Sequence, residues 1–300
     1  MVQPGRRAVP RADRRPLRRH RAADRGRGTA LTGADVALLL GAGVLAGITS
    51  TVAGLASLVS YPALLAVGLE PQDANMTNSA ALICVALGAA AGSRPELAGQ
   101  TRRIARYGAA TLAGGATGAV LLLTTPARAF ELVVPWLILG AAGLLLLSPR
   151  IMSTAGGSAG TARDGGARAA RDDEAGGPAR GERPAMLLAV FGVAIYTGYF
   201  GAGAGVALLA IMVIAIPESL ARVNAVKNVA SGFSNVVAAV IFAALGSIAW
   251  GAAVPLAAGL LVGGAVGPRI VRLLPAPLMR WIVAAAATGL AVSLALDAYT

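Results

Sequence analysis

The sequence predicts an all-α fold: a polytopic integral membrane helical bundle built from two internal repeats with broken or re-entrant helices. Hydrophobic residues make up 56% of the 300 residues and charged residues only 13%, well below the roughly 25% of a typical soluble domain. The apolar residues gather into ten stretches, which fall into two sets of five around one long hydrophilic segment. A soluble protein of this size needs far more polar surface, so a soluble fold is excluded.

Composition divides the chain into four parts. Residues 1–33 form a basic tail that contains ten arginines, and residues 149–184 form a linker rich in Gly, Ala, Arg and Asp. Neither part has enough apolar side chains to bury a core, so both are predicted to be flexible. The first membrane repeat covers 34–148 and the second covers 185–300.

Only some of the apolar stretches are long enough to span a membrane, which takes about 20 residues. The first two stretches of each set are shorter and are interrupted by glycines. We expect each short pair to form one broken crossing, which gives about eight crossings in all. If instead every stretch crosses, there are ten crossings and the two halves are inverted. The stretches are approximately 36–53, 54–69, 74–92, 104–124 and 130–148, then 185–200, 201–216, 221–245, 249–268 and 278–297.

Matching motifs in the two sets support an internal repeat. Breaking a helix in lipid frees backbone N–H and C=O groups, which are costly unless they face protein, water or substrate. Short, glycine-interrupted segments at matching places therefore point to a substrate site near the membrane midplane, and Gly54, Gly201 and Gly203 are candidates for it. The alternative is that these glycines only allow close helix packing. The matched pairs, each offset by about 150 residues, are Gly54–Ser57 with Gly201–Gly205, Ala74–Asn78 with Val223–Asn228, and Gly114–Gly118 with Gly263–Gly267.

A polar face on the stretch 221–245 contains Lys227, the only lysine of the chain. Asn224, Lys227, Asn228 and Ser231 share one helical face, at i, i+3, i+4 and i+7 spacing. An ammonium with amide donors near a helix N-terminus suits an anion, so these four residues are predicted to bind substrate. The alternative is that Lys227 reaches out to a lipid headgroup. The matching candidates in the first half are Asn75, Thr77 and Asn78.

Other function classes lack the residues they need. The only histidine is His20 in the tail and the only cysteine is Cys84, so neither a Ser-His-acid set nor a Cys/His metal cluster can form. We therefore expect no enzyme and no cofactor. The tail contains no aromatic residues to stack on bases, which disfavours nucleic-acid binding. Basic segments beside a first span usually stay in the cytoplasm, so the N-terminus is predicted to be cytoplasmic.

The glycine breaks and polar pairs, taken in order, resemble the sulfite exporter TauE/SafE family of membrane transporters. The resemblance covers about 36–296 and implies movement of sulfite, a sulfonate or a related organic anion across the plasma membrane. The first break contains fewer glycines than is usual in similar proteins. A non-transporting scaffold or sensor with a basic cytoplasmic tail is the alternative function. The motifs are Gly54–Pro62 with Gly198–Gly205, Ala74–Asn78 with Val223–Asn228, and Ala249–Trp250 followed by Gly263–Arg269.

Overall fold

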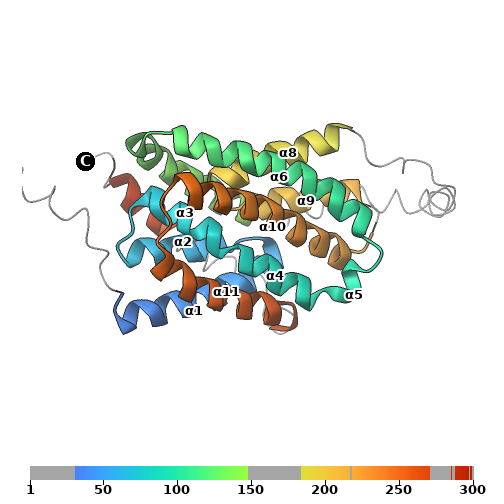
Figure 1. Ribbon diagram of the computed structural model, residues 1–300, viewed down its shortest axis with the longest axis horizontal. Coiled ribbons are helices and arrows are strands. Elements are labelled where there is room, and N and C mark those ends of the chain that lie inside the picture. Colours follow the sequence, from blue (N-terminus) through green and yellow to red (C-terminus); the bar gives the residue numbers. More distant parts are fainter. Residues whose placement is uncertain are drawn as a thin grey trace, which may run out of the picture. The chain divides into compact units, whose positions relative to one another are not determined.

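The computed structural model describes residues 31–147, 184–216, 218–270, 285, 288–296 and 298, and all regular elements within these ranges are helices (Figure 1). The predictions for the tail and the linker fall almost entirely outside the described residues. The helices are α1 (Gly33–Ala53), α2 (Ser57–Ala66), α3 (Pro71–Ala81), α4 (Ile83–Gly92), α5 (Arg94–Leu97), α6 (Thr101–Thr124), an unlabelled helix Ala127–Leu147, α8 (Pro184–Tyr199), α9 (Ala204–Ala215), α10 (Leu220–Leu245), α11 (Trp250–Ile270) and a terminal helical segment 288–296.

Six of the described helices have the length and apolar composition of membrane spans. The shorter apolar helices α2, α8 and α9 all lie at the predicted glycine breaks. This pattern confirms a polytopic helical membrane protein whose two repeats each begin with a broken helix pair. The six spans are Gly33–Ser50, Pro71–Gly92, Thr101–Thr124, Ala127–Leu147, Leu220–Leu245 and Trp250–Gly267.

Local sequence signals set the ends of the broken helices. Thr32 and Asp35 form a capping box at the start of α1, in which each side chain accepts the other's backbone N–H, a common helix start. α1 ends at Ala53, and the residue that follows, Gly54, has a left-handed φ of 68°. Gly201 and Gly203, with φ of 77° and 74°, separate α8 from α9. Glycine has no Cβ and adopts this region at no steric cost, so the chain can change direction at both breaks.

Contacts between glycines show that the first helix, α1, runs in the same direction as α11. Gly43 and Gly47 of α1 lie against Gly259 and Gly263 of α11, in the same order along both helices. The contact requires residues without side chains, as is common where membrane helices pack closely. The α1 and α11 helices therefore run parallel.

The continuous span of α3 and α4 also runs parallel to α11. The backbone N–H of Ala249, just before α11, donates to the hydroxyl of Thr77 in α3. Further along both elements, Gly88 of α4 lies against Gly264 of α11. Accordingly α1, α3 and α11 all begin at one end of the bundle, which we call end A (Figure 1).

The helices α6, α8 and α10 run parallel to one another and begin at the opposite end, end B (Figure 1). Gly114 and Gly118 of α6 lie against Ala194 and Gly198 of α8 in the same order. Gly115 of α6 lies against Ser234 of α10, and one turn earlier the hydroxyl of Thr111 donates to the carbonyl of Ala230.

Each short pair is therefore a hairpin that returns to the end from which it came. Because α1 and α3 both begin at end A, α2 must lead back to end A; because α8 and α10 both begin at end B, α9 must lead back to end B. The structure differs here from the expected single broken crossing. The 10 residues of α2 and the 12 of α9 span only about 15–18 Å, too little for a 30 Å hydrocarbon core.

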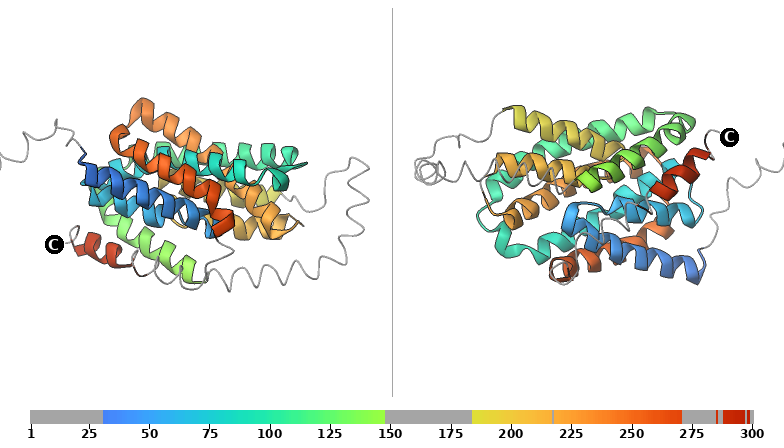
Figure 2. Two further views of the ribbon diagram at one scale, coloured as in Figure 1. Left: turned by 90° about the horizontal axis from the view of Figure 1, so that it is seen from below. Right: turned by 180° about the vertical axis from the view of Figure 1, so that it is seen from behind.

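The two hairpins enter from opposite ends, so the halves are inverted. The alternative expectation also had inverted halves, but it required every stretch to cross, and α2 and α9 are too short to do so. Packing between the halves is reciprocal. The first helix of each repeat packs on the fourth element of the other: α1 on α11, and α8 on α6. At end A the terminal segment 288–296 runs beside the helix Ala127–Leu147 (Figure 2), and Arg128 there donates to the carbonyl of Ala298.

An ion cluster joins the two halves at end B. Arg103 of α6 and Arg222 of α10 donate to opposite oxygens of Glu218, at 2.9 and 3.1 Å. Gln100 donates to the same carboxylate at 3.4 Å. Desolvation by burial alone would raise the pKa of the Glu218 carboxyl, but the hydrogen bonds from Arg103, Arg222 and Gln100 outweigh it and hold that pKa below its ordinary value.

The lowered pKa predicts how the Glu218 cluster responds to pH. Its stabilising effect is fully present above the unfolded pKa of about 4.3 and is lost as pH falls through the lower folded pKa. We expect Glu218→Gln to reduce the free energy of unfolding at pH 7 by about 1 kcal/mol or less, since such ion pairs are partly screened. Thermal unfolding at pH 7 and below pH 4 measures this difference, which should shrink in acid. Glu131→Gln, which removes an exposed ion pair with Arg128, is the control; equal effects of both variants at every pH would contradict the prediction.

Candidate functional site

The tips of the two hairpins touch at their backbones. A Cβ built on Gly54 would lie 2.5 Å from the Cα of Gly205, and a Cβ built on Gly205 would lie 2.6 Å from the Cα of Gly54. Real Cβ atoms do not approach backbone atoms so closely, and therefore only glycine fits at either position. The two helix breaks, about 150 residues apart in the chain, consequently form one site shared by both halves.

Lys227 lies beside this contact. Its side chain is only 1% exposed, and its Nζ atom lies 3.2 Å from the position that a Cβ on Gly54 would occupy. Among the described residues, no hydrogen-bond partner reaches this buried Nζ. An ammonium has three donors, and burying it without an anionic partner costs several kcal/mol. The hairpin tips thus enclose a lysine side chain whose hydrogen-bond donors remain available.

A cavity of about 60 Å³ surrounds this position. A single water needs about 10–15 Å³ of such space, so the cavity has room for several waters. Its described lining contains hydroxyls, amides and the ammonium but no carboxylate, and no group of acidic, His or Cys residues within the described ranges could hold a metal ion. The polar lining residues are Ser50, Ser57, Ser79, Thr197, Lys227, Asn228, Ser231 and Asn235.

Most of the candidates from the second half line the cavity. Lys227, Asn228 and Ser231 do so together with Asn235, which lies one turn further along α10. Asn224 is not among the lining residues. Of the candidate glycines, Gly54 and Gly201 line the cavity, whereas Gly203 faces elsewhere, since a Cβ there would lie 3.0 Å from the Cβ of Ala141.

The polar candidates of the first half do not line the cavity but brace the elements around it. Asn75 donates to the carbonyl of Tyr199 at the second break, at 2.7 Å. Thr77 accepts the N–H of Ala249 at the start of α11. Asn78 accepts a hydrogen bond from Ser60 of α2 at 2.5 Å. Two of these three residues thereby hold a hairpin against α3.

Four hydroxyl residues of the cavity were missed by sequence reasoning: Ser50, Ser57, Ser79 and Thr197. For the residues of α3 and α4 that line the cavity, the sequence repeat could have identified the correct positions. The repeat offset that matches Asn78 to Lys227 also matches Ser79, Leu82 and Ala86 to Asn228, Ser231 and Asn235, and all six line the cavity. The first-half amides, which were chosen by residue type, lie on a side of that helix that does not line this cavity. Ser50, Ser57 and Thr197 carry no such signal, because they lie next to the breaks, whose geometry comes from the fold.

Comparison with known proteins agrees with this architecture. The family model for the sulfite exporter TauE/SafE matches residues 39–294. A "Probable membrane transporter protein" of Haemophilus influenzae is 25% identical over 242 residues, which cover 79% of this chain and 85% of that protein. No solved structure matches the chain.

Inverted halves whose broken helices meet at a buried polar cavity are the architecture of a membrane transporter. The chain belongs to the sulfite exporter TauE/SafE family, whose model covers most of its length. The resemblance seen in the glycine breaks and polar pairs of the sequence is thereby confirmed.

Proposed function

We propose that this protein is a secondary transporter that moves a small anion, such as sulfite, a sulfonate or a related organic anion, across the plasma membrane. In this proposal the anion binds in the central cavity. The observation that carries it is the buried ammonium of Lys227, which has no hydrogen-bond partner among the described residues and lies where the two hairpin tips meet.

The chemistry of the lining suits an oxyanion. Lys227 supplies a positive charge, Asn228 and Asn235 each carry an amide that can donate a hydrogen bond, and the hydroxyl of Ser57 can donate as well. Charge-assisted hydrogen bonds are stronger than neutral ones, and the low dielectric around a buried site strengthens them further. The absence of a carboxylate from the described lining leaves the anion without a competitor for the ammonium.

The position of the site suits transport. Both halves contribute to the cavity, and each half begins with a hairpin from a different end. Rocking one half against the other would expose such a site to each side of the membrane in turn. We further propose that the N-terminus is cytoplasmic, because a basic segment directly precedes the first apolar helix in the sequence; end A then faces the cytoplasm.

Ligand-induced stabilisation of the purified protein tests the proposal. An anion that binds the folded state stabilises it and so raises the unfolding temperature. At a concentration 100 times the dissociation constant, the free energy of unfolding increases by about 2.7 kcal/mol. We expect a shift with sulfite, thiosulfate, a short sulfonate or a short carboxylate at constant ionic strength, and none with choline or an uncharged sugar. Proteoliposomes then measure uptake of the anion that gives the largest shift. If no anion shifts the unfolding temperature, or if uncharged solutes shift it equally, the proposal fails.

A further inference from the structure

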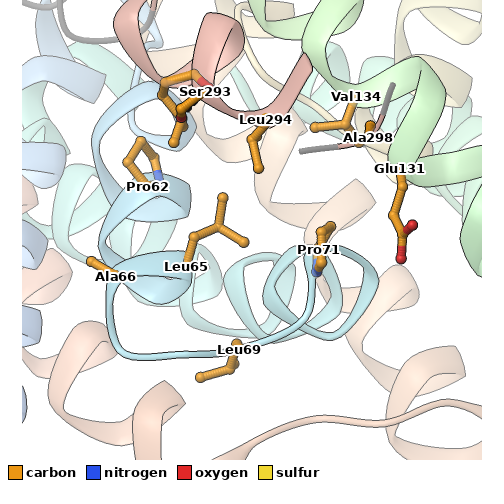
Figure 3. Close-up of a pocket in the computed structure, with 11 residues that line it drawn as sticks. Pro62, Leu65, Ala66, Leu69, Pro71, Glu131, Val134, Ser293, Leu294 and Ala298 are labelled. Atoms are coloured by element: carbon orange, nitrogen blue, oxygen red, sulfur yellow. Dashed lines mark hydrogen bonds between the residues drawn. The ribbon is translucent and has the colours of Figure 1, made fainter. Parts of the chain in front are cut away.

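A second cavity of about 490 Å³ lies at end A, beside the first hairpin (Figure 3). Its walls come from the end of α2, the connection to α3, the helix Ala127–Leu147 and the terminal segment 288–296. The lining is largely apolar, with Leu65, Leu69 and Val134 facing the space, and its one described charged residue is Glu131. An anion finds no donor-rich position there, so this cavity is unsuited to hold one.

Four aromatic side chains, which we call the aromatic cluster, pack together next to this cavity. They are Tyr61 of α2, Phe130 of the helix Ala127–Leu147, and Tyr199 and Phe200 at the second break. The ring of Phe200 packs edge-to-face with the rings of Tyr61 and Phe130, with distances between ring centroids of 5.3 and 6.1 Å. Phe130 also contacts Tyr199 at 5.9 Å. Tyr61, Phe130 and Phe200 are each at most 3% exposed.

The aromatic cluster connects the two cavities. Phe200 lines the central cavity. Its neighbour Tyr61 donates a hydrogen bond to the carbonyl of Pro71 at 3.3 Å, and Pro71 lines the larger cavity. Phe130 directly precedes Glu131, which also lines the larger cavity. A layer of buried rings from both halves of the protein therefore stands between the space at end A and the site at Lys227.

We infer that the larger cavity is the end-A vestibule of the substrate path and that the aromatic cluster is the gate between vestibule and site. This inference rests on the proposed function, since it assigns a route to the same cavity. Phe200 directly precedes Gly201, whose left-handed conformation ends α8, so a movement of the second hairpin displaces the ring. Edge-to-face ring contacts are individually weak, and rotation of Tyr61 and Phe200 opens the layer without unfolding a helix. An anion crosses the apolar vestibule without being retained and stays at the ammonium.

Chemical labelling of the central cavity tests the gate without relying on transport. In a Cys84→Ala background, Ser57→Cys places one thiol in the cavity, and a small anionic methanethiosulfonate reagent measures its accessibility in the purified full-length protein. Labelling tracks the population of open molecules, so we expect Tyr61→Ala to raise the rate about tenfold or more. Tyr61→Phe keeps the ring and loses only the hydrogen bond to Pro71, so its rate should stay near that of the parent. Phe242→Ala, which removes a fully buried ring outside the cluster, controls for loosened packing.

The route through the vestibule needs a separate variant. Leu65→Trp adds volume to the lining of the larger cavity and should slow labelling in the Tyr61→Ala protein. If Tyr61→Ala does not fold, Phe200→Leu replaces it, with the same expected increase. The gate is overturned if both gate variants are labelled at the parental rate, or if Phe242→Ala raises the labelling rate equally. The route through the vestibule is overturned if Leu65→Trp does not slow the labelling. If anions neither bind nor move but the labelling results hold, the proposed function alone fails.

Discussion

Replacing Lys227 with methionine is expected to weaken anion binding in the central cavity roughly 10- to 150-fold while making the protein more stable. The ammonium is buried and, among the described residues, has no partner, so in the empty protein it is a cost. Exchanging a buried charge for an apolar side chain of similar size is often neutral or stabilising, by about 1–4 kcal/mol. The bound anion loses a charged hydrogen-bond partner, which costs about 1.5–3 kcal/mol of binding free energy. Binding is therefore weakened roughly 10- to 150-fold.

The opposite signs of these two effects separate a binding role from a structural one. Thermal unfolding without ligand gives the stability, and the ligand-induced shift with uptake into proteoliposomes gives binding and transport. Lys227→Arg should recover part of the binding, because a planar guanidinium is not a compact ammonium. Ser234→Ala removes another buried group of the same helix that has no hydrogen-bond partner within the described part of the chain. Ser234 does not line the cavity, so this variant should bind the anion normally. A Lys227→Met protein that moves the anion at the parental rate would refute the site.

Adding a methyl group at the contact of the hairpin tips is expected to disable the protein. The Cβ of Gly54→Ala or of Gly205→Ala would lie within 2.6 Å of backbone on the opposite hairpin, and backbone cannot rotate away. Overpacking of this kind costs about 1–3 kcal/mol. Gly54→Ala adds about 1 kcal/mol or more, because its φ is left-handed. Separating the tips would also displace the cavity around Lys227, so transport should fall further than the unfolding temperature.

Helical glycines elsewhere in the same hairpins provide the matched controls. A Cβ on Gly41 of α1 or on Gly192 of α8 would meet nothing within 4 Å. Gly41→Ala and Gly192→Ala should therefore be neutral or slightly stabilising, by up to about 1 kcal/mol, because alanine favours the helix. Uptake into proteoliposomes and thermal unfolding compare the four variants. Parental transport by Gly205→Ala would show that the two tips need not touch for function.

The sequence by itself determined the membrane class, the two repeats and the places where helices break. These features follow from local chemistry. A long apolar segment cannot remain in water, and the glycines near Gly54 and Gly201 allow backbone conformations that other residues avoid. The polar face around Lys227 was also visible, because helical spacing alone places Asn228 and Ser231 beside it. Its role as an anion site remains a proposal.

Only the tertiary structure decided how these parts are joined. After Gly54 the chain can continue across the membrane or turn back, and the residues of α2 are compatible with both. The choice is made by packing between segments far apart in sequence, since α1 and the α3–α4 span both lie parallel to α11 and so force α2 back to end A. The same packing inverts the halves and brings Gly54 against Gly205. It also turns Ser79, rather than Asn75 or Asn78, toward the cavity, because the side of a helix that faces a site depends on its neighbours.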